Sequence, residues 1–257
     1  NVANKVLLQG YQAAPPGTKV IAKQVLARDF RAMPRVQFGE APTLLKVLEG
    51  GEFKRGKMAD AKESYSVEAY GRVMGITRQA LVNDALSGSP PRARKFGQSA
   101  AEFESSQITG PLTANGTMND GGALFNATAV TTAGGHANLA TGTGSALSAT
   151  SVAAGVKAMR LQKGLDTVTP INVMPKFLIV PAALEYTALQ LVSMITPAAA
   201  SDVNPYAGKL EVIVDARLDG ASTTAWYLAA DPAVIDGLEC ASLEDAPGVQ
   251  LFTEEGF

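Results

Sequence analysis

The sequence predicts an α+β fold in which a charged β-hairpin and a long helix precede a mixed sheet with flanking helices. Two strand patterns and one helix pattern lead to this prediction. Residues 177–180 form an uninterrupted apolar run, which is typical of a buried strand. Residues 64–69 alternate between polar and apolar side chains, as a half-buried strand does. Phe96, Ala100 and Phe103 share one face of the predicted long helix.

The composition fits a folded protein that associates with its own copies. The 257 residues suffice for one large domain or two modest ones, and 46% of them are hydrophobic. Charged residues make up only 18%, against about 25% in ordinary soluble domains, which favours self-association. The net charge of -2 excludes a generally basic surface that would draw the chain onto nucleic acid.

The residues needed for catalysis or metal binding are scarce. His136 is the single histidine and Cys240 the single cysteine, so the chain can form neither a His/Cys metal cluster nor an internal disulfide. His136 lies in a turn-like, glycine-rich loop, and no Gly-x-Ser-x-Gly elbow accompanies it. We therefore predict no catalytic, cofactor-binding or metal-binding residues, and a protein that is not an enzyme.

The sequence shows neither a membrane-spanning segment nor a signal peptide. The longest apolar run, residues 177–184, falls well short of the roughly 18 residues that a span needs. The chain begins at Asn1 rather than at Met, and it ends at Phe257 without a turn signal or a polar tail. We interpret both ends as trimmed.

The first 33 residues predict an arm with little core of its own. Val2, Val6 and Leu7 fit one face of a short helix, and two consecutive prolines then break the pattern. The apolar residues that follow occur as isolated pairs without helical or strand periodicity. Such a segment has to be held by contacts outside itself.

Residues 36–75 predict a long, charged hairpin. Two β-rich runs, 44–48 and 64–69, are separated by a glycine pair. Between Lys46 and Arg72 lie 11 charges in 27 residues, so the hairpin has too few apolar side chains to bury itself and needs a partner surface. The charged residues expected to contact a neighbouring subunit are Lys46, Glu49, Glu52, Lys54, Arg55, Lys57, Lys62 and Glu63.

Two helices are expected after the hairpin. Residues 77–86 have a helical pattern, which a Ser-Gly-Ser-Pro-Pro stretch stops. The longer helix runs over about residues 92–108, and Gly110-Pro111 is expected to end it. A helix of this length can serve as the backbone of a domain.

A small basic cluster, Arg92, Arg94 and Lys95, stands at the start of the long helix. Three positive charges there oppose the helix dipole, so a nearby acidic partner or a phosphate is one interpretation. Simple solvation of the three side chains is the other interpretation, and the sequence leaves both open.

The second half of the chain predicts a loop region followed by an α/β passage. Residues 113–146 are rich in Gly, Ala, Thr and Asn and predict loops with short strands. Ser148 or Ser151 can cap a helix that Gly164 closes. The α/β passage predicts strands at 177–180, 210–214 and 225–229, with one helix that bears Leu184, Ala188, Leu191 and Ile195 on one face.

The order of arm, charged hairpin, long helix and α/β region resembles the tailed-phage capsid fold known as the Hong Kong 97 fold. Local strings are similar to those of Mu-like major head subunits, and the likeness runs through nearly the whole chain. Each string has low specificity, but their order is more specific. The strings are NVANKVLLQGY (1–11), EGGEFK (49–54), YGR (70–72), ITRQALVND (76–84), RKFG (94–97), NPYAGKL (204–210) and AWYLA (225–229).

This resemblance implies a division of the chain into the parts of that fold. Residues 1–33 correspond to the N-arm and 36–75 to the E-loop hairpin. Residues 76–118 and 230–257 correspond to the P-domain with its long spine helix, and 119–229 to a mixed α/β A-domain. Relatives continue past Phe257 with further P-domain strands, so the resemblance implies that the P-domain sheet is incomplete in this sequence.

The resemblance also implies a function. It implies a structural major capsid protein that self-assembles, as hexamers and pentamers, into an icosahedral shell around phage double-stranded DNA. The implied partners are many copies of itself, DNA through weak non-specific contact, and portal, scaffold or decoration proteins. The implied location is the virion, after assembly in the bacterial cytoplasm. The alternative is an encapsulin-like shell of the same fold that stores cargo.

Overall fold

The described parts of the computed structural model form two compact units. The described residues are 2–14, 17–39, 60–73, 75, 89–193, 206, 208–245, 248–250 and 252. Unit 1 comprises residues 1–33, 66–110 and 237–257, and unit 2 comprises residues 34–65 and 111–236. The predicted helix at 77–86, the first hairpin run at 44–48 and Ile195 lie outside the described residues.

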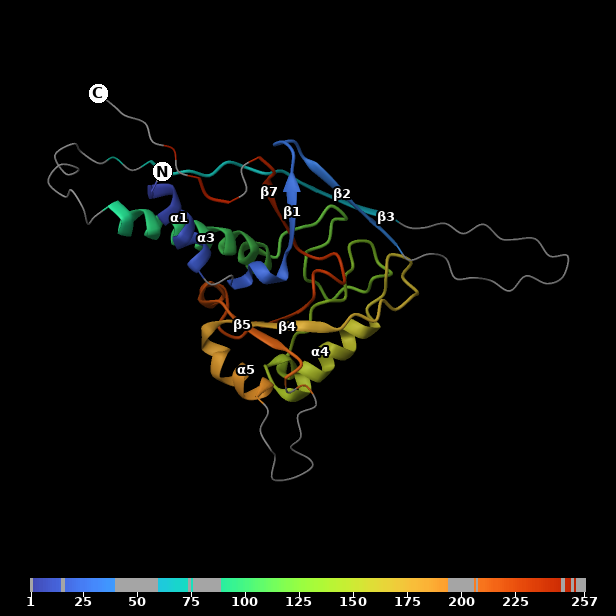
Figure 1. Cartoon of the computed structure of the whole chain (residues 1–257). Helices are drawn as coiled ribbons and strands as arrows, with labels where there is room; N and C mark the ends of the chain where they lie inside the picture. The colour runs from blue at the N-terminus through green and yellow to red at the C-terminus, as the bar shows by residue number, and fades with distance from the viewer. Residues whose placement is uncertain are drawn as a thin grey trace, which may run out of the picture. The chain divides into compact units, whose positions relative to one another are not determined.

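Helices and strands are mixed along the described chain, which confirms the predicted α+β class (Figure 1). The α-helices are α1 (Val2–Ala13), α3 (Ser89–Ala114), α4 (Ala149–Leu161) and α5 (Glu185–Val192). The strands are β1 (Lys23–Ala27), β2 (Met33–Phe38), β3 (Asp60–Tyr65), β4 (Pro175–Val180), β5 (Glu211–Val214), β6 (Tyr227–Ala230) and β7 (Glu239–Leu243). The short 3-10 helices are η1 (Gly17–Ile21), η2 (Thr143–Ser145), η3 (Ala182–Leu184) and η5 (Ala216–Gly220).

Unit 2 is built on a three-stranded sheet with the strand order β5-β4-β6. In the register of the sheet, Leu178 of β4 lies opposite Val212 of the parallel strand β5 and opposite Leu228 of the antiparallel strand β6. The predicted mixed sheet is thereby confirmed. Helices α4 and α5 lie on the same side of this sheet in Figure 1.

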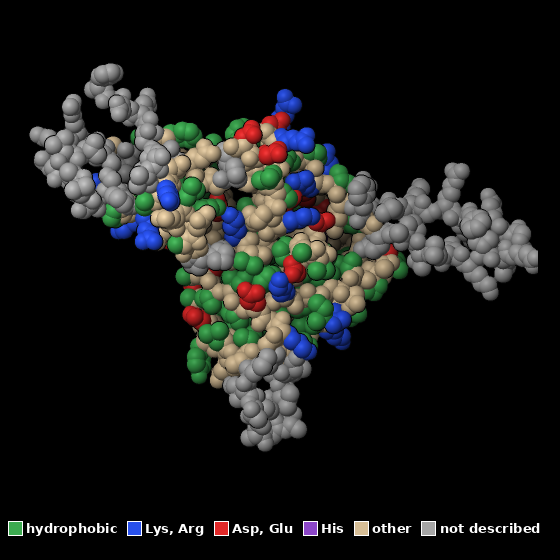
Figure 2. All heavy atoms as spheres, in the orientation of Figure 1, with side chains coloured by type: hydrophobic (Ala, Val, Ile, Leu, Met, Phe, Trp, Pro, Cys, Tyr) green, Lys and Arg blue, Asp and Glu red, His purple; other side chains and the backbone are tan. Residues whose placement is uncertain are grey.

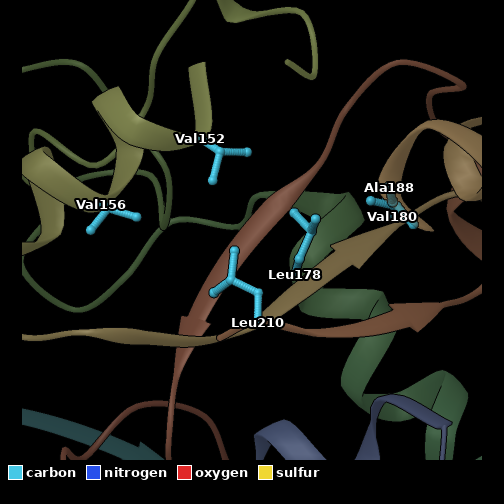
Figure 3. Packing of buried hydrophobic residues seen from close by; sticks show 6 residues of the cluster. All are labelled: Val152, Val156, Leu178, Val180, Ala188 and Leu210. Atoms are coloured by element: carbon cyan, nitrogen blue, oxygen red, sulfur yellow. The ribbon is translucent and has the colours of Figure 1, made fainter. Parts of the chain in front are cut away.

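The core of unit 2 lies between the sheet and these two helices. Leu178 and Val180 of β4 are fully buried, and side chains from α4 and α5 close over them (Figure 3). Each such side chain contributes about 1.5–3 kcal/mol when it is removed from water. The buried members of the cluster are Val152, Val156, Leu178, Val180, Ala188 and Leu210.

The opposite face of β4 is buried as well. Phe177 and Ile179 alternate with the two residues that face the helices, and both are almost completely removed from solvent. Of the other expected core residues, Leu184, Leu191 and Trp226 are partly buried against the cluster. A strand buried on both faces explains why residues 177–180 show a continuous apolar run rather than alternation.

Helix α4 begins as the sequence predicts but ends earlier. Ser148 is its N-cap and forms a capping box with Ser151, so each of these two side chains accepts from the other residue's backbone N–H. The helix ends at Leu161, with Gln162 as C-cap. The expectation that Gly164 closes it is wrong, because the Gly164 carbonyl instead accepts from the backbone N–H of Thr167 in a tight turn.

Two of the described strands lie in unit 1 and pair with each other. β1 and β7 run parallel, with Lys23 opposite Glu239 and Ala27 opposite Leu243. The predicted helix near the N-terminus is confirmed by α1, and the following residues, expected as isolated apolar pairs, form η1 and β1.

Helix α3 is longer than predicted. Gly110-Pro111 was expected to end it, but the helix continues to Ala114 with Pro111 inside it. The proline removes one backbone hydrogen bond. Close to this helix end the loss is offset, because Leu112 is buried and the Asn115 N–H donates to the Pro111 carbonyl.

The predicted apolar face of α3 is not the face that unit 1 buries. Phe96 and Phe103 are 37% and 38% exposed. Apart from Ile108, the buried positions of the helix within this unit carry small or short side chains, among them Ala93, Gly97 and Ser105. Helical periodicity therefore identified an apolar face but could not tell which face the subunit covers.

Candidate subunit-contact surfaces

Helix α1 packs on α3 by direct contact between backbones. A Cβ atom built on Gly10 would lie 2.2 Å from the carbonyl oxygen of Arg94. A Cβ atom on Gly97 would lie 2.1 Å from the carbonyl oxygen of Leu7. Real Cβ atoms do not approach oxygen so closely, so only glycine allows this crossing. The side chain of Leu7 is buried there.

A polar cluster fastens the residues after α1 to the same helix. The Tyr11 hydroxyl donates to Glu104 Oε2 at 2.6 Å, and Lys19 Nζ donates to the same oxygen at 2.6 Å. Lys19 Nζ also donates to the Tyr11 hydroxyl oxygen at 3.1 Å. At the next residue of α3, the Thr18 hydroxyl lies 3.1 Å from the Ser105 carbonyl oxygen, to which it donates. These bonds hold the predicted arm against α3.

The partly buried cluster shifts the pKa values of two of its members. Burial, together with the hydrogen bond to Glu104, raises the pKa of Tyr11. Burial by itself would lower the pKa of Lys19, but its hydrogen bonds to Glu104 and Tyr11 outweigh this and raise it. At neutral pH the cluster therefore holds a protonated lysine and a neutral tyrosine.

Sequence reasoning missed this docking of the first 33 residues. The available signal was a row of small residues at every fourth position of the long helix. Such a row forms a shallow groove in which a second helix can pack closely. The row consists of Ala93, Gly97, Ala101, Ser105 and Thr109.

Two of the hairpin residues predicted to contact a neighbour can be placed, and both make contacts at the base of the hairpin. β2 pairs with β3 there. Glu63 Oε1 accepts from the backbone N–H of Asn119 at 2.7 Å, and the Lys62 carbonyl accepts from Asn119 Nδ2 at 2.9 Å. These bonds anchor β3 to a loop of unit 2. The remaining predicted contact residues, Lys46, Glu49, Glu52, Lys54, Arg55 and Lys57, lie outside the described residues.

The basic cluster at the start of α3 is solvent-exposed. Arg92, Arg94 and Lys95 are all exposed, and the first turn of the helix contains no acidic residue. None of the three makes an ion pair within the part of the chain that the structure describes. Their charges therefore add to the positive end of the helix dipole without compensation inside the described subunit.

The single histidine has a structural place in a loop of unit 2. His136 Nε2 lies 2.8 Å from Asp120 Oδ2, and its Nδ1 lies 2.7 Å from the Ala123 carbonyl oxygen. The Gly122 N–H and the imidazole lower the pKa of Asp120. The Asn126 side chain accepts from the His136 backbone N–H at 2.9 Å. The ring thus cross-links two turns of the loop and has no nucleophile beside it.

The described residues offer no reactive constellation. They include no group of three or more His, Cys, Asp or Glu side chains that could hold a metal ion. Burial raises the pKa of the Cys240 thiol, which leaves it a poor nucleophile. Over the same residues, none of the helices has the length and apolar character to cross a membrane.

Comparison with protein families decides which class of protein this is. The family model of phage capsid proteins matches residues 61–257, which is most of the chain. The chain belongs to this phage capsid protein family. The match covers α3, the mixed sheet of unit 2 and β7, so the elements described above are those of a capsid protein.

Solved capsid structures share the fold of this capsid protein. The capsid protein of bacteriophage JBD30 matches with a TM-score of 0.64 and 17% identity over 80% of this chain and 92% of that one. The capsid of bacteriophage JBD30 decorated with minor capsid protein trimers matches with a TM-score of 0.59 and 16% identity, over 79% and 91%. Comparison with curated protein sequences finds no match.

As a phage capsid protein, the chain is a structural component of the head shell. A shell is held together by contacts between its subunits, so the surfaces of interest are those through which subunits can meet. This confirms the function implied by the sequence resemblance at the level of a phage head shell, and it does not favour the cargo-storing alternative.

Proposed function

We propose that many copies of this chain tile an icosahedral shell around the double-stranded DNA of a tailed, Mu-like phage. The match of the capsid family model to residues 61–257 carries this proposal. The low fraction of charged residues, 18%, and the net charge of -2 support it, because copies with few like charges associate readily. Figure 2 shows hydrophobic side chains spread over the visible face between basic and acidic ones, so that neither charge sign dominates it.

The parts of the Hong Kong 97 fold are proposed from the sequence order. We assign residues 1–33 to the N-arm, 36–75 to the E-loop, 76–118 and 230–257 to the P-domain, and 119–229 to the A-domain. α3 is then the spine helix of the P-domain, and the β5-β4-β6 sheet belongs to the A-domain. The β2-β3 pair forms the base of the E-loop.

The charged hairpin is proposed to reach a neighbouring subunit. Its 11 charges between Lys46 and Arg72 leave it without a core, and an isolated hairpin is marginal in water. The bonds between Asn119 and the backbone and side chain of β3 hold the base of the hairpin, so the charged part beyond can form contacts elsewhere. Lys54, Arg55 and Lys57 would meet acidic groups of the neighbour.

Further partners follow from this role. Packaged DNA would touch the shell through weak, non-specific contacts, because the near-neutral chain has no large basic surface. The JBD30 capsid carries minor capsid protein trimers, so a decoration protein is proposed here too, with portal and scaffold proteins as other head components. The virion would be the final location, after assembly in the bacterial cytoplasm.

Electron microscopy of the purified chain tests the proposed shell. We expect uniform polyhedral particles. Particles that contain a cargo enzyme instead of DNA when isolated from their native host would favour the encapsulin-like alternative. A chain that stays monomeric at all concentrations and salt conditions would contradict self-assembly itself.

A triple charge reversal tests the hairpin. Changing Lys54, Arg55 and Lys57 together to Glu should leave the circular dichroism spectrum intact, because no core packing is expected of them. Light scattering should show weakened assembly at low salt and partial recovery at high salt, because salt screens like-charge repulsion. The charge-conserving control Lys54→Arg, Arg55→Lys and Lys57→Arg should assemble normally. Normal shells from the triple Glu variant at low salt would refute this contact.

A further inference from the structure

Among the described residues of unit 1, the face of α3 that carries Phe96 and Phe103 is covered only in part, and the two side chains are 37% and 38% exposed. The ring of Tyr70 lies 4.7 Å from the ring of Phe103, centroid to centroid, yet Tyr70 is itself 61% exposed. Val73, close by in sequence, is completely exposed. Phe96 and Phe103 lie two turns apart on one helical face. Tyr70, Phe96 and Phe103 together form a partly exposed surface, which we call the aromatic face. Aromatic side chains dominate the energetics of protein interfaces.

The internal packing of α3 uses its other side. The backbone of α1 lies directly against Gly97. The Thr18 hydroxyl forms hydrogen bonds with the Ser105 carbonyl oxygen and with the Thr109 hydroxyl. Among the described residues, the packing of α3 against α1 and η1 therefore does not use the aromatic face, which leaves it open to a partner.

Positive charge borders the aromatic face. Arg92 lies one turn before Phe96 on the same side of the helix. Lys95 directly precedes Phe96 and points about 100° away from it, at the edge of the aromatic face. Neither residue makes an ion pair within the described residues. Arg72, in the segment that carries Tyr70, is also exposed and makes no ion pair there. A partner that covers this face should therefore bring carboxylates to its edge.

The same chain carries an acidic counterpart. Residues 218–257 contain eight Asp or Glu residues and no Lys or Arg. Within this segment Glu244 and Asp245, directly after β7, are exposed and make no ion pair among the described residues. The basic and acidic side chains belong to one unit, but among the described residues they form no ion pairs with each other. In a head-to-tail contact between two copies, the basic side chains of one copy can pair with the acidic side chains of the next, and this contact repeats from copy to copy.

We propose that the aromatic face of α3 is covered by a second copy of this chain, which places its Glu244 and Asp245 against Arg92 and Lys95. The inference rests on the proposed self-assembly and specifies one of its contacts. Duplex DNA is a less suitable occupant, because a phosphate-binding surface needs extended positive charge, whereas this one combines aromatic rings with a few cations.

Removal of the two rings tests the apolar part. The variant Phe96→Ser/Phe103→Ser should keep its circular dichroism spectrum and a cooperative thermal transition, because neither side chain takes part in the crossing of α3 with α1. The concentration needed for assembly, followed by light scattering, should rise at least about tenfold, as for the loss of central interface aromatics. The matched control Gln98→Ser, exposed on another side of the same helix, should assemble like the parent chain.

Charge exchange tests the identity of the occupant. Arg92→Glu/Lys95→Glu and Glu244→Lys/Asp245→Lys should each impair assembly, and the variant with all four changes should regain it, because opposite charges again face each other. Failure of the fourfold variant to recover would refute Glu244 and Asp245 as the partner groups. Normal assembly of either charge variant or of the aromatic variant would refute the contact, while the parent shells would still support the proposed function.

The DNA alternative has its own readout. A fluorescent duplex of random sequence should bind the parent subunit and Arg92→Glu/Lys95→Glu equally weakly at 0.15 M salt. Loss of DNA binding in this variant together with unchanged assembly would assign the basic cluster to DNA and overturn the proposal.

Discussion

Units 1 and 2 each pack helices onto another element, but through different contacts. In unit 2, branched side chains of α4 and α5 interlock with Leu178 and Val180 on a strand. In unit 1, α1 meets α3 at Gly10 and Gly97, where no side chain separates the backbones. The core of unit 2 is therefore sensitive to the removal of atoms, and the crossing in unit 1 is sensitive to their addition.

The interiors of the two units also differ in their content of polar side chains. Buried positions of unit 1 include Thr18, Ser105 and Thr109. The hydroxyls of Thr18 and Thr109 bond to each other, and both donate to the Ser105 carbonyl. The core cluster of unit 2 is made of apolar side chains. An apolar core tolerates exchanges of similar volume, whereas a hydroxyl network demands a defined partner for each group. Four predictions test this contrast.

The largest effect is expected from a cavity in unit 2. Leu178→Ala should lower the free energy of unfolding by about 2–5 kcal/mol, because the side chain is fully buried at the centre of the sheet. Urea denaturation measures the change. Leu189→Ala on α5, where the side chain is 49% exposed, is the control and should cost far less. Equal losses for the two variants would show that the core does not lie where the burial indicates.

An added methyl group should disturb unit 1. Gly97→Ala should cost about 1–3 kcal/mol, because its Cβ would overlap the Leu7 carbonyl oxygen and α1 has to shift. Urea denaturation gives the magnitude, and limited proteolysis shows release of α1. Gly110→Ala in the same helix meets no atom within 4 Å, so it should be neutral or stabilise by up to about 1 kcal/mol. Destabilisation by both changes would point to a helix-wide effect and contradict the crossing.

Removal of the shared carboxylate should weaken the polar cluster of unit 1. Glu104→Gln should cost about 1–2 kcal/mol at pH 7, because the partly buried hydrogen bonds to Tyr11 and Lys19 lose their charged acceptor. The pKa values of Tyr11 and Lys19 are both raised in the folded chain. Their contribution to stability is therefore complete below the ordinary values of 10.0 and 10.5 and is lost as the pH rises through the folded-state values.

The pH dependence separates this ionic effect from a packing change. Denaturation at a series of pH values from 8 to about 11 should show a steeper loss of stability in the parent chain than in Glu104→Gln. Parallel curves for the two proteins would mean that Glu104 does not set the protonation of the cluster.

The smallest effect concerns a strained turn in unit 2. Thr167 has a φ angle of 60°, a left-handed conformation that a β-branched residue adopts at a cost. Thr167→Gly should raise the free energy of unfolding by up to about 1 kcal/mol, because glycine has no Cβ to strain. Thr167→Ala keeps a Cβ, so its free energy of unfolding should rise less than that of Thr167→Gly. Thermal denaturation measures both changes. A stability loss in the glycine variant would show that the side chain makes a favourable contact.

Much of unit 2 was predictable because its signals are local. The apolar run at 177–180, the Ser148 cap and the strand near residue 211 depend on neighbouring residues only, and the structure confirms them. The end of α3 was predicted wrongly, because burial of Leu112 outweighs the local cost of Pro111. The predicted end of α4 at Gly164 was wrong for a related reason, since that glycine serves a following turn.

The candidate contact surfaces were predictable to a smaller extent. The charge density of the hairpin and the basic cluster at Arg92 are visible in the sequence, and the structure places the cluster on an exposed helix end. The hydrogen bonds of Glu63 and Lys62 with Asn119 were not predictable, because these residues lie far apart in the chain and no pattern links them.

The sequence by itself showed a low fraction of charged residues, which favours self-association, and it predicted the periodic elements of the mixed sheet. It also showed that α3 has an apolar face with Phe96 and Phe103. Only the tertiary structure decided that this helix buries its small residues under α1 and leaves both rings exposed. The physical reason is that periodicity records which side chains share a face, whereas burial depends on how closely a distant segment can approach, and Gly10 and Gly97 allow the closest approach.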